Sequence, residues 1–250
     1  MAVEEVLKDV GENPIARVCL VPWDPDSDFQ VKRMHQQRTS CGWHQWFVED
    51  KWTVQQREGH KSIHWIVLDS PNPTVDETLI RKHLAKYPDE ATPLMDSATS
   101  LRAQPITPSY SKPFIPVGHI SLDSDGADPE GKLSYDLKDV YRIVAFYVSR
   151  ALHGSGVGRQ AMDALESITA SPPFSAKTLV ISTAADDYPH RIEKFKALGR
   201  KLPMHSISEW YARRGYVQYK LVEEAWWEPD KTGKQWAASA VYMKKDVVQF

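Results

Sequence analysis

The amino-acid sequence predicts an α/β protein in which helices pack on a sheet, organised as a single domain over residues 1–250. Three observations lead to this prediction. Val140–Val148 is a near-continuous apolar run rich in β-branched and aromatic residues, typical of a buried central strand. A helical pattern follows at once from Gly156, and strand-like segments without an internal repeat lie on both sides of this pair.

The first half of the chain contains three predicted strands, at residues 16–23, 62–70 and 114–124, where β-forming apolar residues alternate or run together. Helices are predicted over residues 29–38 and from Trp43 or Trp46 to a stop before Gly59. Residues 71–114 contain seven prolines and one short helical pattern, 76–87. We expect a surface insertion there, although a segment of this length can also form a lid.

The second half follows a turn of Asp, Gly and Pro residues at 123–132. After the central strand, Val157, Ala161, Leu165 and Ile168 fall on one face of a predicted helix that ends at the Ser-Pro-Pro of 171–173. A buried strand is predicted at 177–185, a basic helical insertion at about 188–203, and a short helix at 206–214. Paired strands at 215–224 and 235–245 complete the sheet.

Composition excludes several classes of function. There are 31 basic and 33 acidic residues, so no positive surplus suggests a nucleic-acid partner or an anionic membrane surface. Two cysteines argue against a disulfide scaffold and a zinc site, and we expect no metal. The acidic first residues lack the pattern of a secretion signal, and no apolar run approaches the roughly 20 residues that span a bilayer. We therefore expect a cytoplasmic protein.

The segment HGSGVGR, residues 153–159, places three glycines between the central strand and the following helix. Counted from Gly154, a phosphate loop of the NTPase type needs its second glycine five positions later, and the dinucleotide fingerprint needs its third glycine at the same place; Arg159 stands there. Both motifs are therefore excluded. Gly154, Gly156 and Gly158 still allow positive φ and close approach, and a helix start directs free N–H groups at the turn. This arrangement suits an anion such as a pyrophosphate; a turn that only packs strand against helix is the alternative.

VSRALHGSGVGR (148–159) resembles the coenzyme A loop of the GNAT superfamily of N-acetyltransferases, with His153 where the family has Arg or Gln. EWYARRGY (209–216) is similar to its later Tyr-containing helix, PVGHISL to its third strand, and SAVYMKKDV to its last strand. The resemblance covers nearly the whole chain except the two insertions. Met204 departs from the asparagine that many members place near the coenzyme.

The resemblance implies a mixed, mostly antiparallel sheet whose fourth and fifth strands, 141–148 and 178–184, splay apart to hold the pantetheine arm of acetyl-CoA, the acyl donor. In the family, a strand N–H, here that of Val148, faces the thioester oxygen, and amides of residues 154–159 hold the pyrophosphate. The implied coenzyme-binding residues are Tyr147, Val148, His153, Gly154, Ser155, Gly156, Val157, Gly158 and Arg159.

Acetyl transfer to an amine also needs an acid for the departing thiolate and a base for the amine. Tyr211 matches the family's tyrosine that protonates the sulfur; a packed core tyrosine is the alternative. Candidates for the base are His119, Asp186, Asp187, Glu223 and Glu224. A water relay would make a single base unnecessary, and a strand histidine or an acidic pair at a strand end is often structural.

Trp43, Trp46 and Trp226 lie where the family walls the acceptor site, beside His44, Phe47 and Trp227. They suggest an apolar or cationic amine, although packing of helices on the sheet explains them equally well. The resemblance thus implies transfer of acetyl to the primary amine of a small molecule, by a monomer or homodimer. Acetylation of a protein N-terminus or lysine, and a catalytically weak acetyl-CoA-binding sensor, are the alternatives.

Overall fold

The computed structural model describes residues 16–124, 139–186, 188, 190–202 and 206–247. Most of the turn predicted at 123–132, together with Asp187 and Met204, lies outside the described residues. No described helix is long and apolar enough to cross a membrane.

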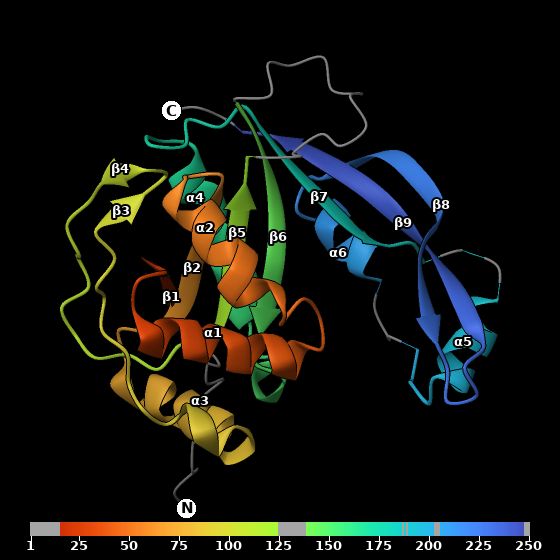
Figure 1. The fold of residues 1–250 in the computed structure, drawn as a ribbon, viewed down its shortest axis with the longest axis horizontal. Coiled ribbons are helices and arrows are strands. Elements are labelled where there is room, and N and C mark those ends of the chain that lie inside the picture. The colour runs from red at the N-terminus through yellow and green to blue at the C-terminus, as the bar shows by residue number, and fades with distance from the viewer. Residues whose placement is uncertain (1–15, 125–138, 187, 189, 203–205, 248–250) are drawn as a thin grey trace, which may run out of the picture.

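Seven strands form one sheet in the order β1-β2-β5-β6-β7-β9-β8 (Figure 1). All neighbouring strands are antiparallel except β6 and β7, which run parallel. The mixed, mostly antiparallel sheet predicted above is therefore confirmed. The strands are β1 (Val18–Pro22), β2 (Lys61–Leu68), β5 (Gly118–Asp123), β6 (Val140–Val148), β7 (Thr178–Ala184), β8 (Val217–Pro229) and β9 (Gln235–Asp246).

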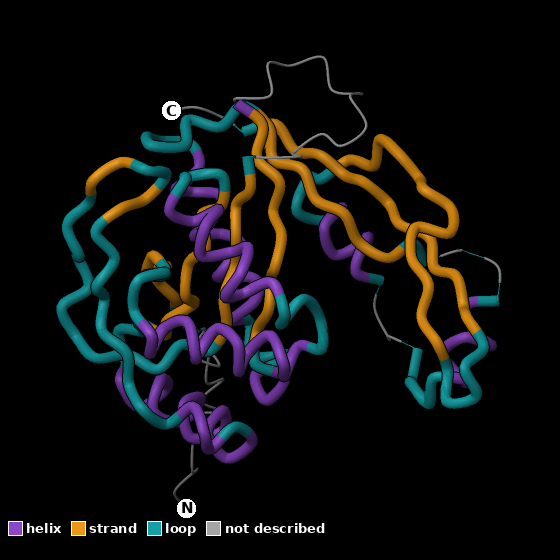
Figure 2. The backbone as a smooth tube through the Cα atoms, in the orientation of Figure 1, coloured by secondary structure: helices purple, strands orange, loops and turns teal. Residues whose placement is uncertain are grey.

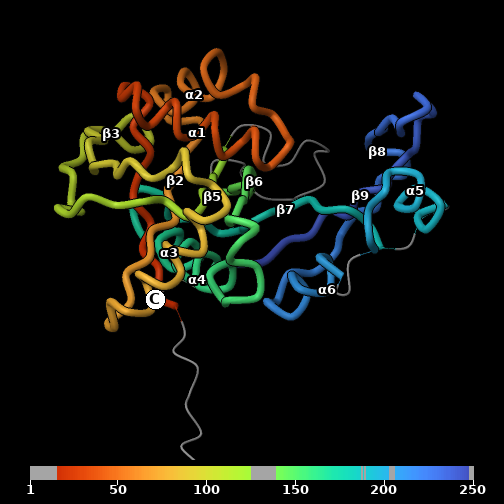
Figure 3. The backbone as a smooth tube through the Cα atoms, turned by 90° about the horizontal axis from the view of Figure 1, so that it is seen from below, coloured from red at the N-terminus to blue at the C-terminus, as the bar shows by residue number. Residues whose placement is uncertain are grey.

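Helices cover the two faces of the sheet. On one face lie α1 (Asp28–Cys41) and the π-helical turn η1 (Val48–Trp52) that continues into α2 (Thr53–Arg57); on the other lie α4 (Val157–Thr169) and α6 (Ile207–Ala212) (Figure 3). Each side buries its own apolar cluster. Val157, Ala161 and Leu165 of α4 are fully buried, as their spacing predicts, and Trp23, Met34 and Trp65 belong to the α1 side.

The helix after α1 begins later than predicted. Trp43 and Trp46 precede it, and the π-helical turn starts at Val48. His44 has a φ of 60°, which no helix interior accommodates. The two tryptophans therefore lie on a loop, which keeps them at the surface.

The proline-rich segment lies largely at the surface and contains more regular structure than the sequence predicted. It contains α3 (Pro73–Lys86), the 3-10 turn η2 (Pro88–Glu90) and a small hairpin of β3 (Ser100–Leu101) and β4 (Gln104–Pro105). Polar side chains of α1 fix it in place: Gln30 donates to the Met95 carbonyl at 2.9 Å and Arg33 to that of Thr92 at 2.8 Å. These hydrogen bonds from buried helix residues anchor the segment to the folded core.

The sheet opens between β6 and β7. The two strands pair only through Val140–Thr178, Tyr141–Leu179 and Arg142–Val180. Beyond these three pairs β7 diverges from β6 and stays paired with β9 of the long β8–β9 hairpin. The helix α5 (Arg191–Ala197), which follows β7 in the chain, lies beside the end of this hairpin (Figures 1 and 2). The far end of β6 thus has no strand on that edge among the described residues. For this reason Phe146 and Val148 are only half-buried, whereas the sequence pattern predicted a strand covered throughout.

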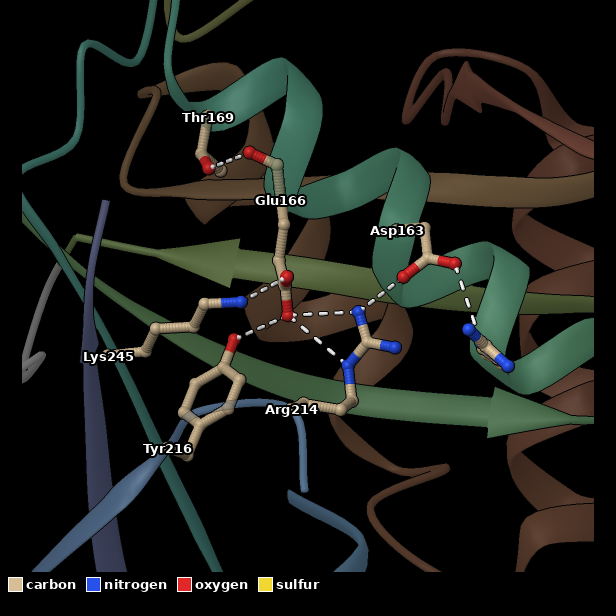
Figure 4. A network of polar contacts seen from close by, with 7 residues as sticks. Asp163, Glu166, Thr169, Arg214, Tyr216 and Lys245 are labelled. Carbon is tan, nitrogen blue, oxygen red and sulfur yellow. Dashed lines mark hydrogen bonds and ion pairs between the residues drawn. The ribbon is translucent and has the colours of Figure 1, made fainter. Parts of the chain in front are cut away.

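A polar network ties the departing strands to α4 (Figure 4). The Glu166 carboxylate accepts from Arg214, from the Tyr216 hydroxyl at 3.2 Å and from Lys245 Nζ at 2.6 Å. Arg214 also donates to Asp163 at 2.7 Å. Arg214 and Tyr216 directly follow α6, and Lys245 lies on β9. The Glu166 carboxylate therefore holds both α6 and β9 against α4.

Two fully buried histidines make stability depend on pH. Burial lowers the pKa of His64 to about 4 and that of His119 well below its usual value. Since the unfolded chain binds these protons below about pH 6.5 and the folded chain does not, the free energy of unfolding should fall as the pH drops from there toward about 4. Near pH 5 each histidine should contribute about 1.4 kcal/mol per pH unit. Urea unfolding of His64→Asn across this range should show a slope smaller by that amount; an unchanged slope would contradict the assignment.

Candidate functional site

A cavity of about 670 Å³ lies where β6 and β7 part. Its walls are largely apolar: Ile143 to Phe146 and Val148 come from β6, Ile181 to Thr183 from β7, and Trp210 and Tyr211 from α6. One end is formed by the glycine turn, through His153, Gly154, Gly156, Gly158 and Arg159. A narrow apolar space that ends in a glycine turn suits a long flexible ligand with a polar end.

The glycine turn presents unpaired backbone donors. Gly154 and Gly156 have φ values of 83° and 86°, which other L-residues adopt only with strain. The first helical hydrogen bond of α4 runs from Gln160 N to Gly156 O at 3.1 Å. The amides of Val157, Gly158 and Arg159 therefore have no backbone acceptor within the described chain, as expected for the first turn of a helix. The helix dipole adds partial positive charge at the same point.

The N–H of Val148 points toward the opening between the strands. Val148 lies opposite Gly118 of β5, and the next residue, Ser149, donates to the Val117 carbonyl at 2.8 Å. Because successive amides of a strand face opposite edges, the Val148 N–H is directed away from β5. That edge faces the cavity, so the amide can donate to a carbonyl oxygen lying there.

Tyr211 forms part of the cavity wall from α6. Its side chain is buried, and its ring contacts those of Trp210 and Tyr216 at centroid distances of 4.8 and 5.6 Å. Burial raises the pKa of Tyr211 to about 12, so its hydroxyl keeps its proton at neutral pH. The helix that carries it is fixed at its first turn, because the hydroxyls of Ser206 and Ser208 both donate to Asp186.

A second cavity, of about 870 Å³, lies on the other side of the glycine turn. It shares Gly154 and Gly156 with the first cavity and is bounded by α3 of the proline-rich segment. Its lining is more polar and includes Asn72, Thr74, Thr78, Lys82, Ser155, Arg159 and Gln160. The turn thus separates an apolar space from a polar one.

Three residues predicted to bind the coenzyme have side chains directed away from the first cavity. The Val157 side chain is buried in the core on the α4 side, and Ser155 faces the second cavity. The Tyr147 ring packs against His119, with the ring centroids 5.4 Å apart, on the face covered by α1. For Val157 the backbone N–H alone is available.

None of the described candidate bases lines the first cavity. His119 is fully buried, its Nδ1 lies 2.9 Å from Gln37 Oε1, and its Nε2 lies 3.4 Å from Arg38 Nη1. Asp186 accepts from two serines and from Arg191. Glu223 and Glu224 lie on a bulge of β8 and line a separate cavity of about 540 Å³ beside α5.

The predicted acceptor-binding tryptophans also separate. Trp43 and Trp46 are exposed on the loop before η1, where His44 and Phe47 contact them edge-on or tilted. Trp226 lies on the β8–β9 hairpin, with Lys194 Nζ of α5 5.9 Å from its ring centroid. The structure does not bring Trp226 together with the other two.

Several cavity residues were not identified from the sequence, among them Trp210, Ser182 and Ser206. Ser206 begins a capping box: its hydroxyl accepts from the Glu209 amide at 2.8 Å, and the Ser-x-x-Glu pattern could have located the start of α6. Ser182 accepts from Arg142 at 2.7 Å across the opening. No pattern along β7 indicates which residues face β6. Among the described residues, no group of three His, Cys, Asp or Glu side chains is placed to hold a metal ion.

No family model matches the sequence, and no curated protein matches it. Among solved structures, a protein from Acinetobacter baylyi with a provisional assignment as an acetyltransferase superposes with a TM-score of 0.52 at 10% identity, over 92% of this chain and 93% of the other. An aminoglycoside 6'-N-acetyltransferase complexed with coenzyme A (TM-score 0.49, 12% identity, 92% and 98% covered) and Arabidopsis thaliana NAA60 with a bisubstrate analogue (0.49, 10%, 92% and 97%) are also similar. The fold implied by the sequence resemblance is confirmed.

Proposed function

Given a chain with the GNAT fold, we propose that it is an N-acetyltransferase that transfers acetyl from acetyl-CoA directly to the primary amine of a small molecule. The observation that carries the proposal is the cavity between β6 and β7, which joins unpaired amides of the glycine turn to Val148 and Tyr211. An extended pantetheine arm fits the parted strands, and its pyrophosphate fits the start of α4.

The reaction then needs four events around one carbonyl carbon. The amine nitrogen attacks that carbon to form the C–N bond, and the carbonyl oxygen becomes an oxyanion; the C–S bond then breaks as the carbonyl re-forms. The Val148 N–H stabilises the oxyanion. Tyr211 donates its proton to the leaving sulfur. The proton lost by the amine passes to water, since no described carboxylate lines this cavity and its histidine, His153, lies at the glycine turn with Nε2 3.2 Å from the Val148 carbonyl oxygen.

A small acceptor is supported by the aromatic cover over the bulge of β6. The register of β5 and β6 shifts at Ala145, whose φ is 50°. Phe47 and Ala145 both pack against the buried cluster that contains Trp52. An acceptor approaching from this face must pass these side chains, which restricts its size. The proline-rich segment, which could have formed a lid, does not line the first cavity.

The function is tested by release of coenzyme A thiol from acetyl-CoA against arylamines, polyamines, amino acids and peptides, with coenzyme affinity measured by calorimetry. We expect transfer to at least one small amine. Transfer confined to peptides would favour a protein acetyltransferase. Coenzyme binding without transfer to any acceptor would favour the sensor.

Gly156→Val should weaken coenzyme binding about 10- to 100-fold, because a branched side chain at this φ would disturb the amides that hold the diphosphate. Gly233→Val is the matched control. Gly233 has the same φ of 86° and the same open surroundings, but lies in the β8–β9 turn. Calorimetry should show the loss of affinity for Gly156→Val only. Equal losses in Gly156→Val and Gly233→Val would show that the glycine turn does not bind the coenzyme.

Lys82 provides a separate test of the second cavity. We expect the polar end of the coenzyme, with its 3'-phosphate, to lie there beside this exposed lysine. Lys82→Met should weaken coenzyme A binding about 3- to 10-fold and leave 3'-dephospho-coenzyme A unaffected, since only the former carries the extra phosphate. Lys86→Met, on the same helix, is the control. Equal effects of Lys82→Met on both ligands would place the phosphate elsewhere.

A further inference from the structure

Arg38 is a buried cation to which the described part of the chain offers no carboxylate partner. The residue is 3% exposed and lies in the last turn of α1. Its Nε donates to the Trp43 carbonyl at 2.9 Å, and its Nη1 lies 3.4 Å from His119 Nε2. Nη2 has no hydrogen-bond partner, and the guanidinium no ion pair, among the residues that the structure describes. Buried charges are normally paired, because desolvating a lone ion is costly.

The bond to His119 does not neutralise this charge. Gln37 Nε2 donates to Glu90 and to the Pro116 carbonyl, which leaves Gln37 Oε1 as the acceptor for His119 Nδ1–H. His119 is therefore a neutral ring whose Nε2 accepts from Arg38. The nearest carboxylate along this chain of contacts, Glu90, is two side chains away.

Other cations gather around the same point. Arg38 and Lys61 both lie over the Trp52 ring, at 5.3 and 5.0 Å from its centroid. Lys61 is also buried, but it pairs with Asp123 at 2.6 Å. The pKa of His44 is lowered by burial and then by Arg38, Lys61 and Lys51, which places its ring among these charges. Asp123 neutralises Lys61, so Arg38 and Lys51 still leave a positive charge around Trp52 and His44.

The register of the sheet places these cations beside the reaction cavity. On β5, His119 lies opposite Tyr147 and Ser121 opposite Val144. Val144 lines the cavity, and directly opposite residues on neighbouring strands are about 5 Å apart. Arg38 contacts His119, so its guanidinium lies one strand away from the bulge of β6, where Val144 and Ala145 line the cavity.

We propose that the acceptor amine also carries a carboxylate, which accepts a hydrogen bond from Arg38. This inference rests on the proposed function and deepens it: the substrate is of the amino-acid type, with its amine in the opening between β6 and β7 and its carboxylate toward α1. A carboxylate restores the pairing that the protein leaves unmade, and arginine suits it because the planar guanidinium matches the carboxylate in shape. The exposed loop carrying Trp43 and Trp46 then borders the entrance.

The test uses sets of acceptors that share one amine and differ at one group: each of the twenty amino acids, its carboxamide, and the amine lacking the carboxyl group. With the whole chain and saturating acetyl-CoA, we expect the best acceptor to be a carboxylate, with kcat/KM about 100-fold or more above its carboxamide. Equal transfer to both would overturn the inference and leave the acetyltransferase intact. Absence of transfer to every member would also overturn the inference, and the acetyltransferase itself would then be decided by the arylamines, polyamines and peptides of the thiol-release assay.

Arg38→Met should raise the KM for the preferred carboxylate and lower its kcat/KM about 100-fold, and should remove most of its advantage over the carboxamide. The KM for acetyl-CoA should stay within about twofold. Arg33→Met is the matched control, because Arg33 is equally buried on the same helix but donates to the proline-rich segment. Arg38→Lys keeps the charge and should retain part of the preference. An undiminished preference in Arg38→Met, with thermal unfolding showing a folded protein, would exclude Arg38 as the carboxylate ligand, and equal loss of preference in Arg33→Met would assign the effect to helix packing.

Discussion

Tyr211→Phe should lower kcat at least about 100-fold and leave the affinity for acetyl-CoA unchanged, since proton transfer by a positioned acid typically contributes 10²- to 10⁴-fold. The thiolate of coenzyme A leaves more easily if it gains a proton as the C–S bond breaks, since a thiol with a pKa of about 8.5 is protonated at neutral pH. Tyr211 lies in the cavity wall, and burial holds its pKa near 12, so its hydroxyl is protonated throughout the physiological range. Steady-state kinetics together with calorimetry separates rate from binding.

Tyr216→Phe is the control for this substitution. The two rings are 5.6 Å apart, but Tyr216 does not line the cavity and its hydroxyl donates to Glu166 at 3.2 Å. Loss of that hydrogen bond should cost about 1 kcal/mol of stability and leave kcat within about twofold. If Tyr211→Phe retains full activity, the proton must come from water, and Tyr211 is then a packing residue.

Gly118→Ala should destabilise the protein by about 3 kcal/mol or more and also lower kcat. A Cβ atom at this position would lie 2.2 Å from the carbonyl oxygen of Tyr147, a separation that requires the backbone of β5 or β6 to shift. Gly118 lies directly opposite Val148, so the shift would reach the amide that faces the cavity. The free energy of unfolding in urea and the kcat of the folded fraction are the two measurements.

Gly158→Ala is the matched substitution on α4. Its Cβ would meet Phe146 Cζ at 3.8 Å and Val148 Cγ2 at 3.9 Å, which are ordinary van der Waals distances. The free energy of unfolding should therefore change by less than about 1 kcal/mol. Wild-type stability in Gly118→Ala would show that β5 and β6 are spaced more widely than described.

The sequence predicted the order and type of most elements because their patterns are local. Val140–Val148 has the predicted bounds and the apolar face of α4 the predicted burial, whereas the second half of β6 is less covered than predicted. The predicted start of the helix after α1 was too early, because residue type alone does not reveal the left-handed conformation of His44. The packing of residues 71–114 was missed because it depends on hydrogen bonds from Gln30 and Arg33, far away along the chain.

At the site, most of the predicted turn residues and Tyr211 line one cavity, because they lie at a strand end, at a helix start and on a short helix. The tryptophans and bases were harder to place. Which face of β5 carries His119, and how far Trp226 lies along the hairpin, depend on register and on two bulges. Arg38 gave no sequence signal at all, since an arginine in a polar helix resembles any solvated residue until its burial is known.

The interruption after Arg142 and Val180 leaves the two parts of the sheet joined by three residue pairs and by contacts such as those of Glu166. A ligand lying in the gap would take the place of a missing strand and would stabilise the folded state. At a concentration 100 times its Kd it would add about 2.7 kcal/mol to the free energy of unfolding. The resistance of the protein to heat and proteolysis would then depend on the concentration of that ligand as well as on its own packing.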